Sequence, residues 1–384
     1  TQRLEGANYS FDPKHFHGPL PGAIAASIAT IRGEQTGSDL RLSTLRMGPV
    51  IAGLCTVLAP LLWIRRFAAS ATLAAAALLA SSPLIVYYNR MYIHESWLLL
   101  FGILSLASLH RLIRKPNWLT ASLAGLCIGL MFATKETFAI SMIAWGIAGF
   151  GLFLSRRQLA IRDYRSPLVW FATIGFVAFV TGSFFYSDGF RNWQGVVDSV
   201  RTYFVYETTP GHEKPTGYYM HTLLWPKQIL GAWWTEICVA LLAATALLRG
   251  MLQRSNFGPY LFLTLATLAH FVIYSWIDYK TPWLMLLPWA HVCLLASLAF
   301  NDLHALRPSL KIALVLLFVG ITSFQTQQSL RATGRSANDE RNPYAYVPTS
   351  RDPVRIGHWL KQIQALPDSP PLHPIAVIGK NYWP

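Results

Sequence analysis

Residues 67–113, "FAASATLAAAALLASSPLIVYYNRMYIHESWLLLFGILSLASLHRLI", decide the fold. Two apolar runs flank a short polar turn that holds Arg90, His94 and Glu95 within six residues. A membrane-spanning helix needs about 20 predominantly apolar residues. The stretch therefore predicts two membrane helices joined by a turn that carries a cation, an imidazole and a carboxylate.

The composition of the whole chain supports this interpretation. Of its 384 residues, 53% are hydrophobic and only 13% are charged, whereas soluble domains carry about 25% charged residues. Apolar windows of near-membrane length recur at 47–64, 67–89, 116–134, 137–155, 166–187, 255–277, 281–301 and 312–330, with weaker ones at 96–113 and 224–248. We expect an all-α polytopic membrane protein with about ten spanning helices.

The net charge of +14 is distributed unevenly between alternate loops. Every second loop holds the basic residues Arg65, Arg66, Arg111, Arg114, Lys115, Arg156, Arg157, Arg162, Arg165, Arg249, Arg254, Arg307 and Lys311. These loops hold only two acids, Asp163 and Asp302, whereas the alternate loops hold Asp12, Glu95, Glu136, Asp188, Asp198, Glu207, Glu213 and Asp278. Cytoplasmic loops are enriched in Lys and Arg, so the basic loops are predicted to be cytoplasmic. This pattern accounts for the net charge and argues against binding of nucleic acid.

Three regions are expected along the chain. Residues 1–45 form an extracytoplasmic loop with a helix on the membrane surface, residues 46–324 the helical membrane domain with a long outer loop at about 187–222, and residues 325–384 the start of a small αβ extracytoplasmic segment. Because the chain begins at Thr1 rather than Met and ends at "NYWP", we interpret it as a fragment.

The four cysteines lie within apolar spans and form no CxxC pair, so neither a disulfide framework nor a zinc site is expected. A histidine–carboxylate metal site with His15, His17 and His94 is left open, since their spacing is not diagnostic. No cofactor is required by the sequence.

Ionisable residues at the predicted membrane boundary gather on the extracytoplasmic side. They are Asp12, His15, His17, Arg90, His94, Glu95, Lys135, Glu136, Glu236, Asp278 and Lys280. Each one alone fits a solvated or snorkelling helix end, but such ends would be scattered over both sides. The cluster fits transfer of a sugar from a polyprenyl phosphate, in which cations bind the departing phosphate and a carboxylate accepts the proton of the acceptor hydroxyl.

The chain resembles the GT-C superfamily of membrane glycosyltransferases, which includes protein O-mannosyltransferases and the aminoarabinose transferase of lipid A. It is most similar to the flippase-activity-associated proteins linked to archaeal-type N-glycosylation. The stretches that carry the resemblance are "YSFDPKHFHGPL", "YNRMYIHESWLLLF", "GLCIGLMFATKETF", "YYMHTLL" with the following Glu236, "YKTPW" and "NPYAYVPTS".

The resemblance implies roles for individual residues. Glu95 matches an acidic residue of the second outer loop, Lys135 a "TK" element implicated in binding the lipid phosphate, and Lys280 a "KTPW" turn at the mouth of the cavity. The most characteristic acid of the superfamily follows its first membrane helix, upstream of Thr1, and Asp12 is a poor substitute for it.

These observations predict an inverting glycosyltransferase of the cell membrane, with its active site on the extracytoplasmic face. Its partners are a polyprenyl-phosphate-linked sugar and a glycan, lipid or protein acceptor. The catalytic candidates are Glu95 and Asp12, and the substrate-binding candidates are His17, Arg90, His94, Lys135, Glu136, Glu236 and Lys280. The alternative is a flippase or transporter of lipid-linked sugars, or a non-catalytic accessory protein of one.

Overall fold

The structure, a computed structural model, describes residues 6, 9–37, 39–155, 167–207, 211–253, 257–346, 358–359 and 361–366. Its elements are α1 (Leu20–Ile31), α2 (Leu42–Leu58), η1 (Ala59–Trp63), α3 (Ala69–Ser81), α4 (Pro83–Tyr88), α5 (Glu95–Arg114), α6 (Trp118–Thr134), α7 (Phe138–Ser155), α8 (Pro167–Tyr186), α9 (Gln194–Val205), α10 (Tyr218–Leu223), β1 (Lys227–Ile229), β2 (Ala232–Trp234), α11 (Ile237–Gln253), α12 (Gly258–Trp276), η2 (Pro282–Met285), α13 (Leu286–Ser297), η3 (Leu298–Phe300), η4 (Leu303–Ala305) and α14 (Pro308–Thr333).

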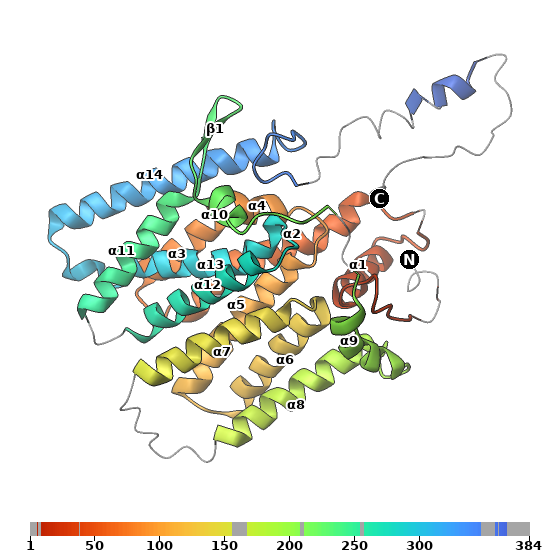
Figure 1. Ribbon diagram of the computed structural model, residues 1–384, viewed down its shortest axis with the longest axis horizontal. Helices are drawn as coiled ribbons and strands as arrows, with labels where there is room; N and C mark the ends of the chain where they lie inside the picture. Colours follow the sequence, from red (N-terminus) through yellow and green to blue (C-terminus); the bar gives the residue numbers. More distant parts are fainter. Residues whose placement is uncertain are drawn as a thin grey trace.

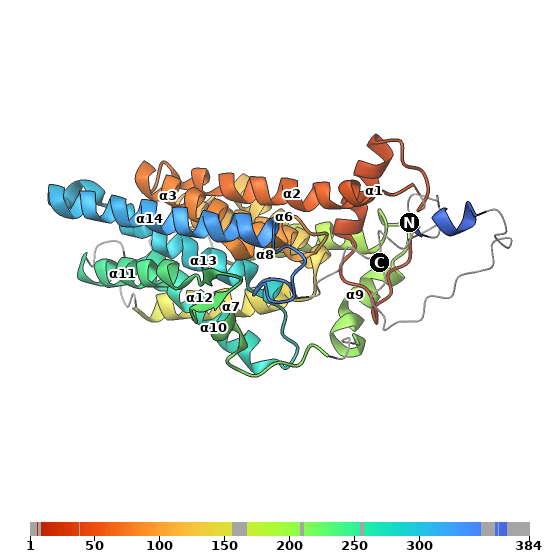
Figure 2. The same cartoon turned by 90° about the horizontal axis from the view of Figure 1, so that it is seen from above.

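The long helices lie side by side in one bundle, with α1 and α9 together at one end (Figures 1 and 2). We call this the α9 end, and the other the opposite end. Among the described residues, seven helical segments are long and apolar enough to span a membrane, beginning at Leu42, Glu95, Phe138, Leu168, Gly258, Pro282 and Pro308. The all-α polytopic fold is therefore confirmed, and the chain is a multi-pass membrane protein.

The remaining three expected spans correspond to shorter helices. Window 67–89 is divided into α3 and α4 at Ser82. This residue directly precedes Pro83, and its hydroxyl caps α4. Window 116–134 is the 17-residue α6, and window 224–248 contains a β-hairpin before α11 begins. Hydropathy detects these segments, but the break at Pro83 follows from its missing N–H donor.

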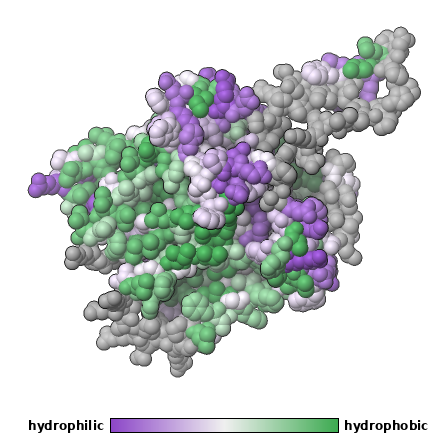
Figure 3. Space-filling view, viewed as in Figure 1, coloured by the Kyte–Doolittle hydropathy of each residue, from purple (hydrophilic) through white to green (hydrophobic). Residues whose placement is uncertain are grey.

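The bundle is built around α13. The segment Pro282–Phe300 is almost wholly buried, and α13 packs against α3, α5, α11 and α12. A helix that is apolar on all sides is expected at such a central position. By contrast, α8 and α14 are mostly exposed and present side chains such as Phe176 and Leu316 outward. Figure 3 shows the resulting apolar surface over the bundle, with hydrophilic residues towards the α9 end and around α10 and β1.

Close packing of α6 on α8 depends on two glycines one turn apart. A Cβ atom on Gly125 would lie 2.6 Å from the carbonyl oxygen of Ile174, and one on Gly129 would lie 2.7 Å from that of Ala178. Small residues at this spacing let membrane helices approach closely. The approach positions α6, the helix that directly precedes Lys135, against α8.

The structure contains helices within two of the loops predicted from the sequence. Helix α1 lies within the expected first loop, and α9 and α10 lie within the long loop at 187–222. The division of the chain into three regions is not tested by these helices and stays a prediction. The stretch "PIAVIGK" at 374–380, which indicates the strand of the expected αβ segment, lies outside the described residues, as do Arg156, Arg157, Asp163 and most of the C-terminal segment.

Candidate functional site

Lys135 and Glu95 form a buried ion pair at the α9 end of the bundle. Lys135 directly follows α6, and Glu95 is the first residue of α5. Because α5 packs against α6, these two helix ends are neighbours. Lys135 Nζ donates to Glu95 Oε1 at 2.5 Å, and the two side chains are only 3% and 4% exposed. Burial disfavours the ammonium ion, but Glu95 and then Glu136 raise the pKa of Lys135 above its usual value.

A second pair, His17 with Glu136, lies beside the first. His17 Nδ1 is 3.0 Å from Glu136 Oε2, although 119 residues separate them. Gly18 holds the N-terminal segment in place, since a Cβ there would lie 2.3 Å from the carbonyl oxygen of Ala133. Burial raises the pKa of Glu136, but the hydrogen bond and charge of His17 outweigh it, so the carboxyl pKa lies below its usual value.

Two further rings complete this cluster. The rings of His17 and Tyr206 stack at 5.2 Å, and the Tyr206 hydroxyl lies 3.4 Å from His17 Nε2. The ring of His94 meets that of His17 edge-on at 4.9 Å. Burial, and then the charges of His17 and Lys135, hold the pKa of His94 well below its usual range.

These pairs border a cavity of about 160 Å³. Its polar lining includes His17, Lys135, Glu136, Tyr206 and Tyr279. Tyr274, Ile277 and Leu284 supply apolar lining. The cavity therefore offers a buried cation, an anionic carboxylate and an imidazole beside aromatic faces, a set that can bind a phosphate and a hydroxyl together.

Lys280 adjoins the cavity but is bound to main-chain groups. Its Nζ donates to the carbonyl oxygens of Ile277 at 2.5 Å and Lys214 at 3.0 Å. The side chain is 1% exposed. These bonds tie the turn after α12 to the segment that precedes α10.

Arg90 lies against the end of α14 rather than in the cavity. Its Nη1 donates to the carbonyl oxygen of Thr333 at 3.3 Å, and its guanidinium lies 4.8 Å from the centre of the Tyr87 ring. Asp12 is also outside the cavity lining. Its carboxylate accepts from the main-chain N–H of Lys14 at 2.9 Å and lies 2.8 Å from His15 Nδ1.

Glu236 is fully buried in a separate network. Its carboxylate accepts hydrogen bonds from Ser82 Oγ at 2.7 Å, Trp289 Nε1 at 2.5 Å, the Leu84 N–H at 3.2 Å and the Tyr344 hydroxyl at 3.4 Å. The structure thus brings together His17, His94, Glu95, Lys135 and Glu136, with Lys280 adjacent. It places Arg90, Asp12 and Glu236 elsewhere. The roles assigned to all nine residues stay predictions.

Sequence reasoning did not single out the tyrosines of the cavity. Tyr206, Tyr274 and Tyr279 lie in stretches rich in aromatic residues, and membrane proteins place such residues at both interfaces. Only the folded chain shows which tyrosines reach the cavity. Among the described residues, no three His, Cys, Asp or Glu side chains are grouped as a metal site.

Comparison with known proteins identifies the fold. Residues 16–184 match the family model of dolichyl-phosphate-mannose-protein mannosyltransferases, a span that includes both pairs of the site. No curated protein sequence matches the chain.

Two kinds of solved structure share its architecture. ArnT from Cupriavidus metallidurans in the apo state matches with a TM-score of 0.57 and 16% identity, over 84% of this chain and 54% of that one. The same protein bound to undecaprenyl phosphate matches with a TM-score of 0.51 and 14% identity over the same shares. The archaeal oligosaccharyltransferase AglB from Archaeoglobus fulgidus, in complex with an inhibitory peptide and a dolichol-phosphate, matches with a TM-score of 0.58 and 13% identity, over 96% and 53% of the two chains.

The chain thus spans about half the length of the structures it matches. These findings confirm the resemblance to the GT-C superfamily and show the GT-C fold. The narrower resemblance to flippase-activity-associated proteins stays a prediction.

Proposed function

We propose that the chain belongs to a membrane glycosyltransferase that moves a sugar from a polyprenyl-phosphate donor to an extracytoplasmic acceptor. The observation that carries the proposal is the buried Lys135–Glu95 pair, whose lysine lines a cavity together with His17 and Glu136. The match to mannosyltransferases that use dolichyl-phosphate-mannose supports it. So do the fold neighbours that hold undecaprenyl phosphate and dolichol-phosphate.

Lys135 would bind the phosphate of the donor. An ammonium group has three N–H donors, and Glu95 accepts one of them. The carboxylate of Glu95 keeps Lys135 protonated and fixes its position. The remaining donors can then stabilise the negative charge that develops on the departing lipid phosphate.

Glu136 and His17 would face the acceptor. The acceptor oxygen attacks the anomeric carbon, the bond from that carbon to the phosphate oxygen breaks, and the hydroxyl proton passes to a base. A single displacement of this kind inverts the anomeric centre. Glu136, held by His17, accepts a hydrogen bond from the hydroxyl, and Glu95 and Asp12 remain the other acidic candidates.

The α9 end would lie on the extracytoplasmic side of the cell membrane. At the opposite end, the turn after η1 holds Arg65 and Arg66, and the last turn of α5 holds Arg111 and Arg114. Loops rich in Lys and Arg stay in the cytoplasm. The cavity would then open where the headgroup of a polyprenyl lipid meets water.

A transfer assay in detergent tests the proposal. The purified full chain is incubated with a panel of polyprenyl-phosphate monosaccharides that carry labelled sugar and with glycan, lipid or peptide acceptors. Transfer of label to the acceptor and release of the polyprenyl phosphate are both measured. The comparison uses Lys135→Met, Lys135→Arg and the control Lys14→Gln, which removes an exposed lysine 3.6 Å from Glu207. Size-exclusion chromatography selects correctly folded protein.

We expect turnover by the wild type and by Lys14→Gln, a loss of about 100-fold or more in Lys135→Met, and partial activity in Lys135→Arg. Detergent micelles have no second leaflet, so a flippase gives no signal. Absence of turnover together with translocation of the lipid in liposomes would establish the alternative function. Full turnover by Lys135→Met would remove this lysine from the site.

A further inference from the structure

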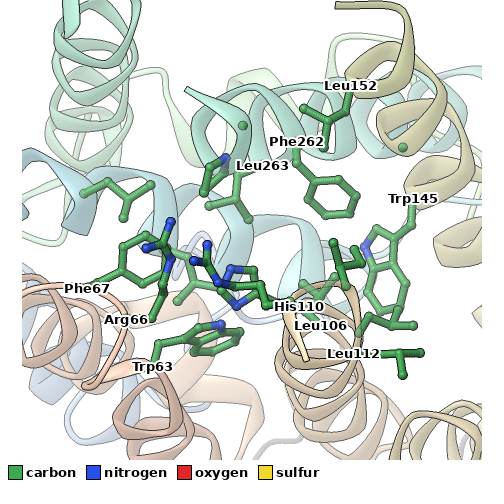
Figure 4. Close-up of a pocket in the computed structure, with 18 of the residues that line it drawn as sticks. Trp63, Arg66, Phe67, Leu106, His110, Leu112, Trp145, Leu152, Phe262 and Leu263 are labelled. Carbon is green, nitrogen blue, oxygen red and sulfur yellow. The ribbon is translucent and has the colours of Figure 1, made fainter. Parts of the chain in front are cut away.

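A second and larger cavity, of about 710 Å³, lies at the opposite end of the bundle (Figure 4). Side chains from η1, α3, α5, α7, α8, α12 and α13 line it. Most are apolar, including Trp63, Phe67, Leu106, Trp145 and Phe262. Binding pockets for small molecules enclose about 300–1,000 Å³. The proposed function makes no use of this space.

The titratable side chains in the described lining of the cavity are all basic. Arg66, His110 and Arg114 line it, and no Asp or Glu is present among the described lining residues. In Figure 4, Arg66 and His110 lie close together, whereas Trp145 and Leu152 lie across the cavity from them. Burial, and then repulsion by Arg114, lowers the pKa of Arg66. An anion between the two guanidinium groups would relieve that repulsion.

The apolar part is open because α7 has small residues there. A Cβ built on Gly146 or on Gly149 meets no atom within 4 Å. Glycine in a helix is less favourable than alanine by about 1 kcal/mol. At these two positions it is not required by close packing, and its effect is to keep the cavity wide.

We propose that this cavity binds an anionic glycerophospholipid, with the phosphate at Arg66 and Arg114 and an acyl chain against Trp145 and Phe262. The arrangement matches the two parts of such a molecule, a negative headgroup and an apolar tail. Basic pockets between membrane helices on the cytoplasmic side bind anionic lipid headgroups in this way. The proposal depends on the membrane topology and not on the transferase function.

A polyprenyl-phosphate donor fits this cavity less well. Glu95 is the first and Arg114 the last of the 20 residues of α5. With a rise of 1.5 Å per residue, the two ends are about 28 Å apart. A phosphate held by Arg114 cannot at the same time be bound by Lys135 beside Glu95.

Native mass spectrometry of the full chain in detergent tests the proposal. Delipidated protein is titrated with phosphatidylglycerol, phosphatidylcholine or undecaprenyl phosphate. The wild type is compared with Arg66→Gln/Arg114→Gln and with the matched control Arg65→Gln/Arg111→Gln, whose arginines belong to the same turns but do not line the cavity. A second comparison sets Gly149→Leu, which fills the cavity, against Gly320→Leu on the exposed face of α14, where a Cβ also meets open space.

We expect the wild type to bind phosphatidylglycerol at least tenfold more tightly than phosphatidylcholine. A juxtamembrane arginine near an anionic lipid contributes about 1 kcal/mol, or about fivefold per residue, so the Arg66/Arg114 variant should lose about 25-fold. Gly149→Leu should also lose binding, and both controls should retain it. Equal binding of the two phospholipids, unchanged binding by Gly149→Leu, or preferential binding of undecaprenyl phosphate would each overturn the proposal.

Discussion

The buried pair at the α9 end makes a quantitative prediction about stability. Replacing Lys135 by Met leaves Glu95, which is 4% exposed, without its ammonium partner. Removing one member of a buried ion pair costs about 3–5 kcal/mol, because the remaining charge is neither solvated nor compensated. Glu95 begins α5, and the helix dipole offsets about 1 kcal/mol of this cost. The net loss expected for Lys135→Met is about 2–4 kcal/mol.

The complementary variant should be less harmful. In Glu95→Gln, Lys135 still interacts with the charge of Glu136, which is the next largest influence raising its pKa. The amide of Gln can also accept a hydrogen bond from the ammonium group. We expect Glu95→Gln to cost about 1–2 kcal/mol, less than Lys135→Met, because each single variant leaves a different buried charge.

The double variant Lys135→Met/Glu95→Gln measures the coupling energy between the two side chains. Replacing a buried ion pair by neutral groups of similar volume is often close to neutral. We therefore expect the double variant to be more stable than Lys135→Met alone, with a coupling energy of about 1–3 kcal/mol. Unfolding with SDS in mixed micelles supplies the four free energies. If the effects of the two single variants simply add, the pair makes no net contribution and the reasoning fails.

Three further predictions concern the same end of the bundle. Gly18→Ala should displace His17 from Glu136 and destabilise the protein by about 1–3 kcal/mol. A structure of this variant in which His17 Nδ1 still lies 3.0 Å from Glu136 Oε2 would contradict this. Glu136 has a lowered pKa, so its stabilising effect is present above its unfolded pKa of about 4.5 and is lost as the pH falls through the folded value. The cost of Glu136→Gln should therefore shrink in acid, and a cost that does not vary with pH would refute this. For sidedness, Glu207→Cys should react with an impermeant thiol reagent in intact cells and His304→Cys should not, and the reverse pattern would invert the topology.

The positions of the helices followed from sequence because membrane length is a one-dimensional constraint. An apolar window of sufficient length predicts a helix without any knowledge of its neighbours. A hydropathy window does not reveal a break within it, such as the one at Ser82 and Pro83, where two helices are found in place of one. The hairpin before α11 was also missed, because its second strand, Ala232–Trp234, is apolar and aromatic and so belongs to the same apolar window as α11.

The candidate site could be predicted only as a location. The alternation of charge between loops predicted that Arg90, Lys135 and Lys280 lie at one end of the bundle. The hydrogen-bond partner of each side chain depends on tertiary contacts, which the sequence does not show. Arg90 and Lys280 are bound to main-chain carbonyls. The last carbonyls of a helix have no partner within it, and those of Thr333 at the end of α14 and Ile277 after α12 attract these two cations. Lys135 instead follows α6 and lies beside Glu95.

The placement of Glu236 bears on the choice between a transferase and a flippase. A protein that moves a lipid-linked sugar across the membrane needs polar groups along a path through the bundle, and ionisable residues inside a membrane commonly mark such a path. Glu236 is the deepest of the sequence candidates, yet it is fully buried and accepts hydrogen bonds from Ser82, Trp289 and Tyr344. Its carboxylate joins α4, α13 and the segment after α14 and does not line either cavity. The polar groups that do line cavities lie near the two ends of α5, a helix about 30 Å long. That separation is expected of a site that performs chemistry at one boundary, and it favours the transferase.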